Sequence, residues 1–175
     1  MVSYFRENYL RDFFTKVPIN EQQRTFSASS NESFDIFLSY NINDKEVVKG
    51  IYYMLKGMGF KVYVDFMVDP LMDRKNVTKE TAGRIQSRLK HSKSLIYAHS
   101  SNASMSKWMP WELGVVDGNT GKCFIMPVQK GHETINSRQE FLLLYPIIGV
   151  NTLSELRVYD SEYSIYSRTF AECLK

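Results

Sequence analysis

The sequence predicts an α/β fold in which helices cover both faces of one parallel β-sheet. Short apolar runs of strand length alternate along the chain with segments whose apolar residues recur at helical spacing. The runs are continuous, which is typical of strands buried on both faces. The length of 175 residues suits a single domain with one hydrophobic core.

The apolar runs place the candidate strands. They lie at residues 34–40, 61–65, 94–98 and 123–128, and the runs at 146–150 and 156–159 compete for a fifth strand. Open α/β sheets bind ligands beyond the carboxyl ends of their strands. The polar residues expected at that edge are Ser39, Tyr40, Asp65, His99, Ser100 and Ser101.

Helix signals lie between these strands. Asn43 begins a capping-box-like pattern before the first helix. Thr78 can cap a second helix, and a third covers about residues 106–116. A short helix is expected over 140–145.

Both ends of the chain also show helical spacing. Residues 1–19 form an amphipathic pattern with balanced charge, whereas a helix that lies on a membrane would be more basic. We therefore expect this helix to pack on its own domain or on a neighbouring protomer. A closing helix is suggested by the spacing of Tyr163, Tyr166, Phe170 and Leu174. The predicted organisation is an N-terminal helical segment (1–26), a linker (27–33) and an α/β domain (34–175).

Composition argues against several classes of function. A net charge of +3 and the lack of a long Lys/Arg run argue against nucleic-acid binding. No apolar stretch reaches the roughly 18–20 residues of a membrane span, and no secretory signal is recognised. Cys123 and Cys173 form neither a disulfide framework nor a zinc site, and the scattered histidines are interpreted as surface or loop residues. We expect a cytoplasmic protein without a metal, nucleic-acid or membrane partner.

The segment 100–113 is the most informative stretch, since no GxGxxG, P-loop or GxSxG motif occurs. Trp108 and Glu112 are four residues apart, so one helix would place them on one face. Pro110 is comfortable only in a first helical turn, so the helix has to begin close to Trp108, with Ser106 as the expected cap. On spacing alone, a glutamate at this position is expected to be an exposed residue with a structural role.

Four motifs in order resemble Toll/interleukin-1 receptor (TIR) domains. Residues 34–40 resemble the first box of the family, 59–65 its second strand, and 122–127 a later strand. Residues 69–74 fall where the family's BB loop lies. The third-helix pattern of the family is matched by Ser100, Trp108, Glu112 and Leu113. The chain is more similar to stand-alone bacterial antiphage TIR proteins of the Thoeris type than to receptor tails.

The resemblance implies a flavodoxin-like, five-stranded parallel sheet in the order 2-1-3-4-5, plus the N-terminal helix. It implies an enzyme that cleaves NAD, releases nicotinamide and makes an ADP-ribose-derived signal for a separate effector. NAD is then the substrate, and no cofactor is expected. The implied site consists of Glu112 for catalysis and Ser39, Tyr40, Asn41, Asp65, Leu71 and Trp108 for substrate binding. The 69–74 loop would gate the site and contact a neighbouring protomer.

Most of these residues also have structural interpretations. Tyr40 and Asn41 could be ordinary loop residues, and Asp65 could be a turn or helix-cap carboxylate. Trp108 either supports Glu112 by packing or lines the pocket. Residues 72–93 hold seven basic against two acidic side chains, which either attract a pyrophosphate or form a solvated helix face.

A single carboxylate is enough for NAD cleavage. Neutral glycosides need an acid to protonate the leaving group, hence the usual two carboxylates. Nicotinamide is already cationic in NAD and leaves as a neutral pyridine, so one carboxylate that stabilises charge on the ribose suffices.

Two other functions share this fold. A TIR scaffold that works by assembly would not need a carboxylate at position 112. A phosphorylated receiver domain needs acidic residues after the first strand and an aspartate ending the third, where this chain has Ser39-Tyr40-Asn41 and Ala98-His99-Ser100.

Overall fold

A computed structural model describes residues 4–23, 28–70, 77–131 and 139–175. Its strands are β1 (Phe5–Arg6), β2 (Phe34–Ser39), β3 (Val62–Tyr63), β4 (Ser92–His99), β5 (Cys123–Gln129), β6 (Ile147–Val150), β7 (Leu156–Tyr159) and β8 (Arg168–Thr169). Its α-helices are α1 (Glu7–Thr15), α2 (Ile19–Gln22), α3 (Lys45–Gly57), α4 (Asp65–Val68), α5 (Lys79–Lys90), α6 (Met109–Thr120) and α7 (Phe170–Cys173). Short 3₁₀ helices are η1 (Ile42–Asp44), η2 (Ala103–Met105) and η3 (Glu140–Leu144).

The sheet has the predicted parallel core. Its strands follow the order β3-β2-β4-β5-β6-β7-β8, and the first five of these run parallel, which is the 2-1-3-4-5 order. Both runs that compete for the fifth position are strands: β6 pairs with β5 in parallel, and β7 returns antiparallel to β6. The expected count of five strands was too low, because β7 and β8 extend the sheet and β1 pairs with β5.

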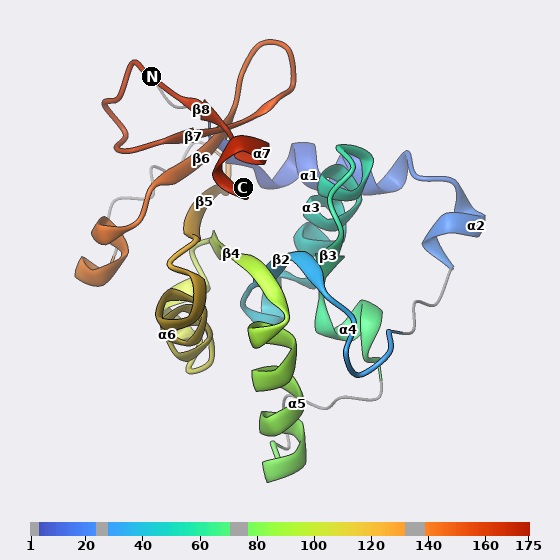
Figure 1. The fold of residues 1–175 in the computed structure, drawn as a ribbon. Helices are drawn as coiled ribbons and strands as arrows, with labels where there is room; N and C mark the ends of the chain where they lie inside the picture. The colour runs from blue at the N-terminus through green and yellow to red at the C-terminus, as the bar shows by residue number, and fades with distance from the viewer. Residues whose placement is uncertain (1–3, 24–27, 71–76, 132–138) are drawn as a thin grey trace.

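Helices cover both faces of this sheet, as predicted (Figure 1). One core cluster joins α1 and α3 to the sheet and includes Leu10, Ile51 and Ile96. The opposite cluster joins α5 and α6 to the sheet and includes Leu89 and Leu113. No helix in the described ranges is long and apolar enough to cross a membrane.

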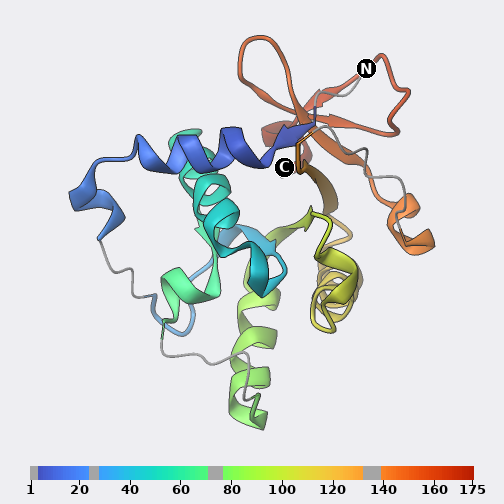
Figure 2. The same ribbon diagram turned by 180° about the vertical axis from the view of Figure 1, so that it is seen from behind.

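The N-terminal segment packs on the same domain. It is not one continuous helix: β1 precedes α1, and α2 follows after a turn. α1 lies across α3 (Figure 2), with Leu10 fully buried between them. A Cβ atom built on Gly50 would stand 2.0 Å from the carbonyl oxygen of Leu10, so the two helices approach closely because position 50 is glycine.

Three helix boundaries differ from the sequence prediction. Asn43 does not begin α3; instead, the Asn41 side chain caps η1. The third helix begins later than expected, at Met109, and ends at Thr120. The closing helix is only Phe170–Cys173, because Thr169 pairs with β7 and then caps α7 in a capping box. Thr78 caps α5 as predicted.

Candidate active site

Glu112 lies in the first turn of α6. Ser106 Oγ accepts hydrogen bonds from the backbone N–H groups of Trp108 and Met109, at 3.3 and 3.2 Å. Pro110 occupies the first turn, where its missing N–H has no helical partner to lose. The Glu112 N–H then donates to the Trp108 carbonyl at 2.9 Å. α6 thus begins directly after Trp108, as Pro110 requires, although later than the expected start at about residue 106. Its N-cap residue is Trp108, not Ser106, whose hydroxyl instead accepts the two N–H groups around the helix start. Trp108 and Glu112 are one turn apart.

The Glu112 side chain points into the protein and has no exposed surface. Ser39, the last residue of β2, donates its hydroxyl hydrogen bond to Glu112 Oε2 at 2.6 Å. The fold thus joins two residues that are 73 positions apart in the sequence. The interpretation of Glu112 as an exposed surface residue is wrong, because α6 presents this position to the carboxyl ends of the strands.

Tyr97 and His99 are both buried at the end of β4; His99 was expected at this edge of the sheet, whereas the sequence analysis did not single out Tyr97. Tyr97 is the β4 residue in register with Ser39 on β2. It is fully buried, and burial, followed by the negative charge of Glu112, raises the pKa of Tyr97 to about 12. The His99 ring lies 6.3 Å from that of Tyr97 and is buried, so it is not the surface residue we expected. The signal available in the sequence was the alternation of β4, which points both side chains to one face.

Tyr40 and Asp65 bond to each other instead of to Glu112. The Tyr40 hydroxyl donates to Asp65 Oδ1 at 2.5 Å, and both residues are buried. Asp65 is the first residue of α4 and also accepts the N–H of Phe66 at 2.8 Å. The Tyr40 side chain packs in the core on the α3 face of the sheet, opposite to the α6 face. The N-cap residue of α4 is Val64, so Asp65 is a carboxylate of the first helical turn and not the helix cap.

A polar network ties the loop after β2 to the loop after β4. The Asn41 amide donates to the Asn102 carbonyl at 2.7 Å. Asp44 accepts the Ser100 hydroxyl at 2.5 Å and the Asn102 amide at 2.6 Å. Asp44 and Asn102 had no signal in the sequence, because only the folded topology places these two loops side by side.

A cavity of about 280 Å³ opens between these two loops. Trp108 lines it and stacks edge-on against Trp111, with the ring centroids 5.4 Å apart. Trp108 also packs against the core cluster that contains Leu113, so both of its expected positions, beside the cavity and against the core, are occupied. The cavity is lined by residues of both loops, namely Tyr40, Asn41, Ile42, Asn43, Met105, Ser106, Lys107 and Trp108. The cavity thus gathers three of the predicted binding residues, Tyr40, Asn41 and Trp108, of which Trp108 lies one helical turn before Glu112.

Comparison with known proteins connects this arrangement to a family. No protein-family model matches the chain. A Bacillus cereus (strain MSX-D12) protein that carries the name of a 3' cyclic ADP-D-ribose synthase, ThsB', is 42% identical over 124 residues, 70% of this chain and 64% of that protein. This likeness indicates a TIR-domain protein of the bacterial Thoeris type. A Cytobacillus dafuensis protein that carries the name of a cyclic ADP-D-ribose synthase, TIR2, is 21% identical over 138 residues, 71% of this chain and 36% of that protein. The chain therefore spans less than two thirds of the length of either relative.

A buried ion pair fixes the start of the 69–74 loop in this TIR domain. Arg88 on α5 binds both carboxylate oxygens of Asp69, at 3.0 and 3.2 Å. The same guanidinium donates to the carbonyls of Ala28 and Ser29, and the Tyr63 hydroxyl donates to Asp69 at 2.9 Å. Leu71 and the rest of the loop lie outside the described residues.

The ion pair also changes the interpretation of the basic segment. Arg88 is occupied by Asp69, so it is not part of a pyrophosphate-attracting surface. Arg74 and Lys75 lie outside the described residues. The remaining basic residues of the segment are exposed: Lys79, Arg84 and Lys90 lie on α5, as on a solvated helix face, and Lys93 lies on β4.

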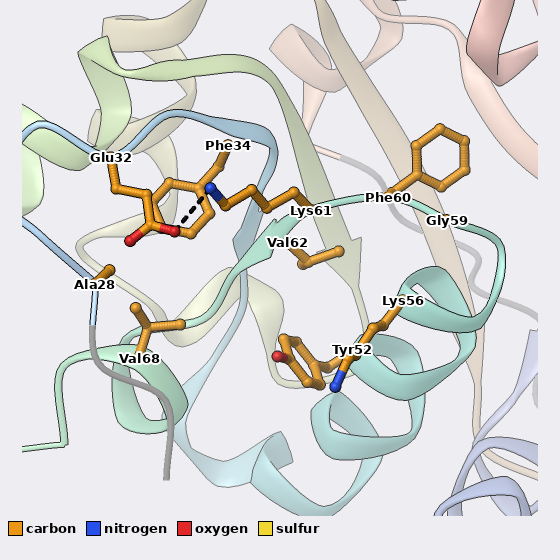
Figure 3. Close-up of a pocket in the computed structure, with 10 residues that line it drawn as sticks. All are labelled: Ala28, Glu32, Phe34, Tyr52, Lys56, Gly59, Phe60, Lys61, Val62 and Val68. Carbon is orange, nitrogen blue, oxygen red and sulfur yellow. Dashed lines mark ion pairs between the residues drawn. The ribbon is translucent and has the colours of Figure 1, made fainter. Parts of the chain in front are cut away.

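A larger cavity, of about 390 Å³, lies away from Glu112 beside the amino ends of β2 and β3 (Figure 3). Lys61 pairs with Glu32 at 2.7 Å across its mouth and lies over the ring of Phe34. None of the predicted site residues lines it.

Proposed function

We propose that this TIR domain cleaves the nicotinamide–ribose bond of NAD and makes a cyclic ADP-ribose-type product. The observation that supports the proposal most is the Ser39–Glu112 pair, buried one helical turn from a cavity at the carboxyl edge of the sheet. The names of the two relatives, both those of cyclic ADP-ribose synthases, point to the same substrate. NAD is the substrate in this proposal, and no separate cofactor takes part.

The proposed chemistry uses one carboxylate. As the bond breaks, its electron pair returns to the nicotinamide ring, which leaves neutral. Positive charge then develops on the ribose, where Glu112 stabilises it most effectively if water is excluded. Attack on the ribose carbon by a hydroxyl of the same ADP-ribose closes a ring, with loss of a proton, whereas attack by water gives ADP-ribose.

Access to Glu112 requires a change from the described conformation. The carboxylate has no exposed surface, whereas Trp108, one turn earlier, lines the cavity. We propose that self-association through TIR surfaces, including the 69–74 loop, opens or completes the site. The product would then act on a separate effector in bacterial antiphage defence, within the cytoplasm.

Glu112→Gln tests the catalytic assignment. The variant keeps the size of the side chain and its ability to accept the Ser39 hydrogen bond, but it loses the negative charge. The reaction is run at high protein concentration, and chromatography measures the nicotinamide released from NAD. We expect the rate of release to fall by about 10²–10³-fold or more. Glu80→Gln, on the exposed face of α5, is the matched control and should release nicotinamide like the wild type. Turnover by Glu112→Gln at the wild-type rate would contradict the proposal.

The alternative is a TIR scaffold that acts through TIR–TIR assembly alone. The observation that favours it is the complete burial of Glu112, since a buried carboxylate can serve packing and hydrogen bonding only. Measuring nicotinamide release by the assembled protein distinguishes the two functions. Assembled wild-type protein that releases no nicotinamide is a scaffold, and assembled protein that releases it is an enzyme.

A further inference from the structure

The hydroxyl group of Tyr97 makes no hydrogen bond within the described part of the chain. The side chain is fully buried, and its Oη atom has no hydrogen-bond partner among the described residues. Buried polar groups are paired in the great majority of cases, because leaving one unpaired costs free energy. Such a hydroxyl is free to donate to a group that reaches it in another state of the protein.

The position of Tyr97 indicates which partner that is. Tyr97 and Ser39 are neighbours in register on β4 and β2, and Ser39 holds Glu112 at 2.6 Å. Tyr97 also belongs to the core cluster that contains Leu113 of α6, the residue next to Glu112. The two hydroxyl groups thus start from adjacent points of the sheet, on the face that α6 covers. A tyrosine hydroxyl reaches farther from its backbone than a serine hydroxyl does.

The hydroxyl is suited to donate. Burial and the charge of Glu112 raise the pKa of Tyr97 to about 12, so the proton stays on the oxygen at neutral pH. The Tyr97 hydroxyl therefore keeps a proton that it can donate to the nearby Glu112 carboxylate. The proposed NAD cleavage requires the Glu112 carboxylate to leave the covered position in which Ser39 holds it.

We infer that Tyr97 is a positioning residue, whose hydroxyl donates a hydrogen bond to the Glu112 carboxylate when Glu112 faces the substrate. The inference rests on the proposed NAD cleavage. It explains why a buried hydroxyl is retained where phenylalanine would fill the same space. Tyr97 acts through Glu112 and does not itself touch NAD.

Tyr97→Phe tests this inference, because it removes the hydroxyl and keeps the ring. We expect kcat for nicotinamide release to fall by about 10–100-fold, the size of effect that a hydrogen bond to a charged group has, with KM for NAD nearly unchanged. The melting temperature should equal or exceed that of the wild type, since the folded state loses an unpaired polar atom. Tyr145→Phe is the control: it removes a hydroxyl bonded to Asp117 at 3.1 Å, and kcat should stay at the wild-type value.

The outcomes are distinguishable from failure of the proposed function. If the wild type releases nicotinamide, Glu112→Gln does not, and Tyr97→Phe matches the wild-type kcat, only the role of Tyr97 is overturned. A marked drop in the melting temperature of Tyr97→Phe would also overturn it, because the hydroxyl would then have a structural partner. If the wild type releases no nicotinamide in any assembly, both proposals fail.

Discussion

At the scale of single residues, the donors around Glu112 decide what its carboxylate can do. Burying a carboxylate is costly unless hydrogen bonds replace the lost water. Ser39 supplies one such bond at 2.6 Å. The importance of position 112 could be predicted from the Ser, Trp and Glu-Leu pattern. Its burial could not, since glutamate is rarely buried, and neither could the proximity of Tyr97, which needs the register of β2 and β4.

Ser39→Ala should therefore destabilise the fold. The change removes the donor to a fully buried carboxylate oxygen, and the expected loss is about 1–3 kcal/mol of unfolding free energy. Urea denaturation monitored by circular dichroism measures it. Ser161→Ala, in an exposed turn, is the control and should stay within about 0.5 kcal/mol of the wild type. Equal stability of Ser39→Ala and the wild type would mean that the Ser39–Glu112 bond contributes nothing to folding.

The Arg88–Asp69 pair is the second residue-scale feature, since it holds the first residue of the 69–74 loop. Both side chains are buried, so truncating Arg88 leaves a charge without its partner. We expect Arg88→Ala to lose about 3 kcal/mol or more in denaturant unfolding. Lys93→Ala removes an exposed ion pair with Asp35 and should cost no more than about 1 kcal/mol. Similar losses in the two variants would contradict the anchoring role of Arg88.

At the scale of elements, patterning predicted what is local and missed what depends on a distant partner. The strands of the parallel core could be predicted because each is a short apolar run in the sequence, and the Thr78 cap could be predicted because it lies directly before its helix. β1 was missed because two residues pair with β5 across more than a hundred positions. The closing helix was predicted too long because aromatic spacing near Tyr163 and Tyr166 looked amphipathic. Both side chains are in fact highly exposed, at 90% and 85%.

Gly50 tests the docking of α1 on α3. An alanine methyl group there would lie 2.0 Å from the Leu10 carbonyl oxygen, so the helices would have to separate. Gly50→Ala should lower the unfolding free energy by about 1–3 kcal/mol, despite the better helix propensity of alanine. Gly83→Ala is the matched helical control, because nothing lies within 4 Å of its added methyl. We expect it to be neutral or to stabilise by up to about 1 kcal/mol. Equal thermal unfolding of the two variants would argue that α1 can shift freely.

At the scale of the whole molecule, the parallel topology brings the residues of the candidate site together at one edge of the sheet. The loops after β2 and β4, which are far apart in the sequence, become the two walls of the cavity near Glu112 because their strands are neighbours. The sequence predicted this edge of the sheet, because parallel strands end on the same side. It could not predict that the carboxylate would be covered, because that depends on how α6 packs.

The covered carboxylate leads to a prediction about assembly. If a single protomer keeps Glu112 inaccessible and self-association opens or completes the site, activity per protomer should depend on protein concentration. We expect nicotinamide release per mole of protein to rise over an approximately hundredfold range of concentration, in step with the fraction of oligomer, as mass action requires. Light scattering after size-exclusion chromatography measures the oligomer, and chromatography of the reaction measures nicotinamide. Glu112→Gln should assemble like the wild type and remain inactive, which separates assembly from chemistry. Constant activity per protomer while the protein stays monomeric would show that one chain can open its own site.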